Sequence, residues 1–186
     1  MNIFFLHPDP LTAAEMHCDK HCVKMILETA QMLCTAHRCL DGDKRADIYN
    51  MYKTAHLNHP STKWVRGSLL QYEWTYHLFK FLCSEYTQRF NKVHLTDKKL
   101  KEILRTPPQS ITDGGEYTQP PQCMPDQYKV PDILWSYMDS IVDVDYPVRA
   151  IEIEDVNKFL NFIDEGPGLP DEELDIPDPR QLVLDI

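Results

Sequence analysis

Six polar residues between positions 17 and 31 recur at intervals of three and four, the spacing that places side chains on one face of an α-helix. They bring together imidazoles, an amine and a carboxylate, which are groups suited to general acid–base chemistry or to contact with a phosphate. A solvated helix surface is the alternative interpretation. The candidate catalytic residues are Glu28, Lys24, His17 and His21, and the candidate ligand-binding residues on the same face are Lys20 and Gln31.

Two pairs in this stretch have a spacing that suits metal binding. His17 and His21 are one helical turn apart, and so are Cys18 and Cys22. The two pairs point in different directions, however, and no second pair of this kind completes a four-ligand site. The sequence therefore predicts no metal site, and we expect no cofactor.

A second polar cluster, residues 56–66, leads into a long helical pattern. The start of a helix offers unpaired backbone N–H groups and the positive end of the helix dipole, and cations in its first turns suit an anionic ligand. Pro60 and Ser61 are equally well explained as signals for the start of a helix. The candidate ligand-binding residues of this cluster are His59, Lys63 and Arg66.

A third candidate region is the string Pro-Pro-Gln-Cys-Met-Pro-Asp-Gln-Tyr-Lys at residues 120–129. Its prolines and its aromatic residue can pack on a flat ring, and its polar groups can read the edge of that ring. Gln122, Tyr128 and Lys129 are its candidate ligand-binding residues. The string would either close over a base or form a rigid belt around the helices.

The pattern of apolar residues predicts the helices that hold these clusters. Spacings of three and four, with no Pro or Gly, indicate one helix over residues 11–38. A stripe from Val65 to Phe90 indicates a long core helix over residues 62–90, and shorter helices are expected at residues 44–53, 96–104, 131–142 and 154–164. The sequence therefore predicts an all-α fold: a single compact helical domain with a long central helix and a Pro-rich loop at residues 105–130.

Length and charge divide the chain into two parts. With 186 residues and 42% apolar content, it can fill one hydrophobic core. Residues 141–186 hold 13 of the 29 acidic but only 3 of the 19 basic residues, so we expect a helical domain over residues 1–165 and an acidic, flexible or partner-binding tail over residues 166–186. The apolar runs of the sequence are too short to span a bilayer. The six cysteines are expected to be free thiols.

Several strings resemble those of a family of small tailed-phage proteins: the nine residues from His17 to Met25, then Asn58-His59-Pro60, and then the Pro-rich string at residues 120–129. The layout also resembles the phage pyrimidine-dimer DNA glycosylases, with a short N-terminal segment, a first helix bearing polar residues, and a Pro-initiated long helix with a late Glu85 and Arg89. These resemblances imply a phage protein in the cytoplasm of the infected host cell that binds a nucleobase, a nucleotide or damaged DNA.

The glycosylase resemblance also implies a mechanism from which this sequence departs. Those enzymes lose Met1 and attack the sugar with the amine of a small second residue, whereas the size of Asn2 should block that removal. Their assisting glutamate falls near Lys24, one turn before Glu28. Either Lys24 would supply the amine, or Glu28 with His17 or His21 would activate water. The alternative function is a non-catalytic inhibitor or small-molecule sponge that acts on a host pathway.

Overall fold

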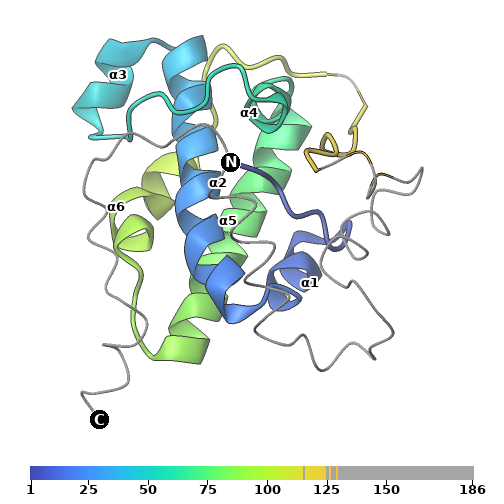
Figure 1. Cartoon of the computed structure of the whole chain (residues 1–186). Coiled ribbons are helices and arrows are strands. Elements are labelled where there is room, and N and C mark those ends of the chain that lie inside the picture. The colour runs from blue at the N-terminus through green and yellow to red at the C-terminus, as the bar shows by residue number, and fades with distance from the viewer. Residues whose placement is uncertain (115, 125, 127–128, 130–186) are drawn as a thin grey trace. The chain divides into compact units, whose positions relative to one another are not determined.

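The computed structural model describes residues 1–114, 116–124, 126 and 129, all of which fall within one unit of the chain, Met1–Ile151. The described residues form six helices and no strand, so the all-α fold is confirmed (Figure 1). The helices predicted at residues 131–142 and 154–164, the acidic tail and Tyr128 lie outside the described residues. The helices are α1 (Pro10–Glu15), α2 (Asp19–Leu40), α3 (Asp43–Ile48), α4 (Pro60–Val65), α5 (Leu69–Phe90) and α6 (Leu95–Leu104).

Two 22-residue helices, α2 and α5, pack along each other and form the centre of the fold (Figure 1). Helix α1 packs on α5, and α3, α4 and α6 pack on α2. The predicted core stripe of α5 is confirmed, with Tyr72, Phe79 and Cys83 fully buried or nearly so. None of the helices among the described residues has the length and apolar content needed to cross a membrane.

The N-terminal segment, residues 2–6, is extended and buried. Ile3, Phe4 and Phe5 are at most 1% exposed, although the segment forms no strand. Because these side chains lie in the core, the segment fixes the start of the chain against the central helices. The backbone of Met1 and Asn2 is thereby held in the interior.

The single helix predicted over residues 11–38 is two helices, because the chain turns at Met16–Cys18. His17 closes α1: its backbone N–H donates to the Ala14 carbonyl, and its ring Nδ1 lies 2.6 Å from the Ala13 carbonyl oxygen. Cys18 is extended and precedes the first turn of α2. Arg89 stabilises this break from the far end of α5.

The guanidinium of Arg89 donates to the carbonyl oxygens of His17 (2.6 Å) and Glu15 (3.0 Å). It also pairs with Asp19 and with Glu85, at 3.2 and 2.7 Å. Carbonyl groups at the end of a helix have no partner inside the helix, so a cation there replaces the missing donors. The sequence pattern misses this break because the stabilising residue is about 70 positions away.

The helix predicted over residues 62–90 is also two helices, α4 and α5, with a turn at residues 66–68. A backbone bond from Gly67 N–H to the Trp64 carbonyl ends α4, and Ser68 is extended. The first N–H of α5, that of Leu69, donates to the Thr112 carbonyl in the Pro-rich segment. A tertiary partner therefore replaces the intrahelical bond that a continuous helix would use.

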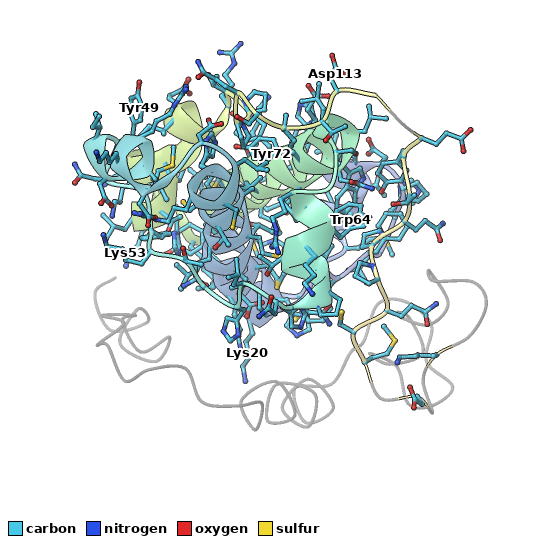
Figure 2. The ribbon with its side chains drawn as sticks, turned by 90° about the horizontal axis from the view of Figure 1, so that it is seen from above. Lys20, Tyr49, Lys53, Trp64, Tyr72 and Asp113 are labelled. Atoms are coloured by element: carbon cyan, nitrogen blue, oxygen red, sulfur yellow. The ribbon has the colours of Figure 1, made fainter. Side chains whose placement is uncertain are left out.

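The described part of the Pro-rich segment packs as a belt on α4 and α5. The Trp64 indole donates to the backbone and side-chain oxygens of Thr118, both at 3.1 Å, and Gln71 donates to the same hydroxyl at 2.7 Å. Tyr117 makes an edge contact with Trp64, which Figure 2 shows beside this segment. The string at residues 120–129, which would either close over a base or form a belt, is described only in part, so both interpretations of it remain predictions.

Candidate functional site

The carboxylate of Glu28 lies at the N-terminus of the chain. Its Oε2 accepts a hydrogen bond from the backbone N–H of Asn2 at 2.9 Å, and it is 3.8 Å from the α-ammonium of Met1. Glu28 is only 8% exposed. A buried carboxylate beside an amine is a pair that can exchange a proton, so this is the strongest candidate for chemistry in the described part of the chain.

Three segments hold the N-terminal residues at Glu28. The hydroxyl of Thr62, in α4, donates to the Met1 sulfur at 3.4 Å. The Asn2 side chain donates to the carbonyl oxygen of Cys123 at 3.2 Å, and the Cys123 sulfur lies 3.4 Å from the Ser61 hydroxyl. The N-terminus is therefore enclosed by α2, α4 and the Pro-rich belt, and in Figure 1 it lies against the middle of α2.

Two histidines contribute to the electrostatics of this site. Burial, then the Met1 amine, then His56 lower the pKa of His59 to about 4. Burial also lowers the pKa of His56, with the amine lowering it further and Glu28 opposing the shift. His56 has a left-handed backbone, with φ of 45°, which is uncommon outside glycine. Both imidazoles are therefore neutral at pH 7 and belong to the surroundings of the amine.

The polar face predicted on the first helix is divided by the structure. His17 precedes α2, and both His17 and His21 are 2% exposed. The Phe4 ring stacks on His21, with ring centroids 4.6 Å apart, and makes an edge contact with His17. His21 and Glu28 are seven residues apart on α2, which corresponds to about 10 Å along the helix axis. The two buried histidines and Glu28 are thus not gathered at one point.

Burial keeps both histidines neutral. It is the main cause that lowers the pKa of His17 to about 4 and that of His21 to about 3. An imidazole that titrates this low stays unprotonated in the folded protein under ordinary conditions. His17 and His21 are core histidines beside Phe4, and their proposed catalytic role remains a prediction.

Lowering the pH should destabilise the protein through His17. Its pKa rises from about 4 to its ordinary value near 6.5 on unfolding, so the unfolded chain binds a proton that the folded chain does not. The free energy of unfolding should fall between about pH 6.5 and pH 4, by up to roughly 3 kcal/mol for this residue. Urea titrations across that range should show a shallower pH slope for His17→Gln. His77→Gln, at an exposed position, is the control for the loss of one imidazole.

The other candidate residues lie at different depths around the site. Lys20 is exposed and projects from the body of the protein (Figure 2). Lys24 and Gln31, on α2, are half-buried, and each is about one turn from Glu28. On α4, Lys63 is exposed, and Arg66, just after the helix, is half-buried. Gln122 is half-buried, and Lys129 is exposed and pairs with Asp126 at 2.7 Å.

Sequence reasoning missed the N-terminal part of the site. No repeating pattern includes the Met1 amine, Asn2 or Cys123. Asn2 is 26 residues from Glu28 and 121 residues from Cys123, so these groups meet only in the folded chain. Nothing in the local sequence around Glu28 marks it as the partner of the chain start. No group of His, Cys, Asp and Glu able to hold a metal ion occurs among the described residues.

Comparison with known protein families identifies a match over the first half of the chain. The model of a family described as pyrimidine dimer DNA glycosylase matches residues 1–98, which include α1 to α5 and therefore Glu28 and its N-terminal partners. No curated protein and no solved structure matches the chain.

Proposed function

Because the chain belongs to the pyrimidine dimer DNA glycosylase family, we propose that it binds damaged DNA and releases a damaged pyrimidine from its sugar. The observation that carries the proposal is the position of Glu28, whose buried carboxylate contacts the nitrogen of Asn2 and lies 3.8 Å from the Met1 amine. Lys20 and Lys24 on α2, Lys63 on α4 and Arg66 just after α4 would supply positive charge for DNA phosphates around this pair. The proposed place of action is the cytoplasm of the infected host cell.

The proposed nucleophile is the α-amine. In its neutral form, its lone pair attacks C1′ of the damaged nucleotide, a C1′–N bond forms, and the glycosidic bond breaks with its electrons leaving on the base. The new ammonium then loses a proton, the C1′–O4′ bond opens, and O4′ takes up a proton. The product is an imine that links the chain to the sugar.

Glu28 is the proposed acid–base partner in these steps. Its carboxylate is within reach of the nitrogen, so it can take the proton that the amine loses and return it to O4′ as the ring opens. It can then remove a proton from C2′, which expels the 3′-phosphate and breaks the strand. Water hydrolyses the remaining imine and frees the amine.

The side-chain amine of Lys24 is the rival nucleophile, since it lies one turn before Glu28 on α2. Two features favour the α-amine: Glu28 contacts the N-terminal backbone directly, and α4 and the Pro-rich belt hold Met1 and Asn2 in place. If Met1 is removed, the nitrogen of Asn2, already 2.9 Å from Glu28, becomes the amine. Both forms of the chain therefore present an α-amine to the same carboxylate.

Trapping of the imine tests the proposal. Full-length protein is incubated with a duplex that contains one cyclobutane pyrimidine dimer, in the presence of borohydride, which reduces an imine to a stable amine. We expect a covalent protein–DNA adduct, and peptide mapping should place it on the N-terminal peptide. An adduct on Lys24 would assign the amine to that residue. If the protein bound dimer-containing DNA but formed no adduct and did not cleave the strand, the proposed enzymatic function would be contradicted. A non-catalytic binding protein would then be favoured.

A further inference from the structure

The hydrogen bonding of His59 fixes which of its ring nitrogens carries the proton. Its Nδ1 accepts the backbone N–H of Ser61 at 3.2 Å, as the cap of α4. A nitrogen that accepts a hydrogen bond has no proton of its own, so in the neutral ring the proton is on Nε2. His59 therefore carries an N–H donor on the side of the ring opposite the start of the helix.

This donor lies beside the proposed reaction centre. The residues that follow His59 hold the N-terminus: Thr62 contacts Met1, and Ser61 contacts Cys123, which in turn binds Asn2. The ring is half-buried, and none of the described residues accepts a hydrogen bond from Nε2. Burial, and after it the neighbouring Met1 amine and His56, lower the pKa of His59 to about 4, so the ring stays neutral.

We infer that His59 is a substrate-binding residue whose Nε2–H donates to a phosphate oxygen next to the sugar that the α-amine attacks. The inference rests on the proposed glycosylase function. Phosphate oxygens receive most of the hydrogen bonds between proteins and DNA, and they fix the position of the strand without reading its sequence. Held at the start of α4, His59 sets the distance between the sugar carbon and the amine.

A neutral donor and a cation differ in the salt dependence of DNA binding. Each Lys or Arg that neutralises a phosphate releases counterions and contributes about 0.9 to the slope of log affinity against log salt concentration. A neutral imidazole releases none. Loss of the His59 donor should therefore weaken binding at every salt concentration while the slope stays the same.

His59→Asn and His59→Ser test the inference, because both residues cap helices well but neither side chain places a donor as far from the backbone as the imidazole Nε2. The matched control is His94→Asn. His94 caps α6 in the same way, with Nδ1 accepting from Thr96 at 3.1 Å, but its ring packs against Tyr86. The probe is a duplex with a tetrahydrofuran abasic site, which binds but cannot form an imine. Fluorescence anisotropy is measured from 50 to 300 mM salt at pH 7.5, with Lys63→Ala as the comparison for a cation.

Both His59 variants should bind the probe about 10- to 100-fold more weakly, with the wild-type salt slope, whereas Lys63→Ala should lower the slope by about 1. His94→Asn should bind as the wild type does. Wild-type affinity of both His59 variants would overturn the role of His59, and a loss of about 0.9 in their slope would show a cationic contact instead. The glycosylase function would survive either result if the wild type still forms the borohydride adduct. Absence of that adduct from the wild type would overturn the function, and the inference with it.

Discussion

Replacing Glu28 by Gln is expected to slow strand cleavage at a pyrimidine dimer by about 10²- to 10⁴-fold, the usual contribution of a positioned acid–base group. The amide can still accept the Asn2 N–H through its oxygen, so the N-terminal segment should keep its place. It cannot take a proton from the amine or from C2′. Single-turnover cleavage of dimer-containing duplex, with protein in excess over DNA, measures this step directly.

The matched control for this substitution is Glu85→Gln. Glu85 is a half-buried glutamate that pairs with Arg89 on α5 and contacts neither Met1 nor Asn2. The Glu85→Gln protein should lose some thermal stability and cleave the DNA strand at the wild-type rate. Binding of the tetrahydrofuran duplex by Glu28→Gln should stay within about threefold of wild type. If Glu28→Gln cleaved at the wild-type rate, the carboxylate would serve only to anchor the chain start.

The sequence pattern predicted the elements that local residues determine. The Lys and Leu content places α6 at residues 96–104, one residue from its observed start at Leu95, and the apolar stripe of α5 is buried as expected. A helix that buries one face must repeat its apolar residues every three to four positions, so this information is present in any short window. The all-α fold follows from it.

The breaks in the two long predicted helices depend on distant residues. Arg89 binds the carbonyl oxygens at the end of α1, and Thr112 accepts the first N–H of α5. Neither interaction changes the spacing of apolar residues around the break. Helical periodicity continues across both turns, so the pattern alone favours a continuous helix.

The candidate site was predictable only in part, for the same reason. Glu28 and His59 stand out as polar groups with suitable chemistry on or beside predicted helices. Their juxtaposition with the chain start requires the burial of Ile3, Phe4 and Phe5, which draws Met1 and Asn2 into the interior. His17 and His21 are histidines one helical turn apart, a pattern that also suits catalytic groups. In the structure the Phe4 ring packs on both of them, and the sequence of α2 does not reveal that contact.

A short N-terminal extension should abolish imine trapping. Adding residues before Met1 converts its amine to an amide, which has no available lone pair for attack on C1′. It also places new chain where Glu28, α4 and the Pro-rich belt enclose the N-terminus. Strand cleavage at a dimer should fall on the order of 10³-fold or more, since loss of a nucleophile removes the covalent route.

The control for the extension is its removal from the same protein. The extension is built with a protease site that leaves Met1 as the first residue after cleavage, and mass spectrometry identifies the new N-terminus. Cleavage should restore both the borohydride adduct and strand cleavage, which a misfolded chain would not do. If the extended protein formed the adduct as well as the cleaved protein, the amine would have to come from a side chain. Lys24→Arg, which keeps the charge one turn from Glu28 but cannot form the imine, would then lose the adduct.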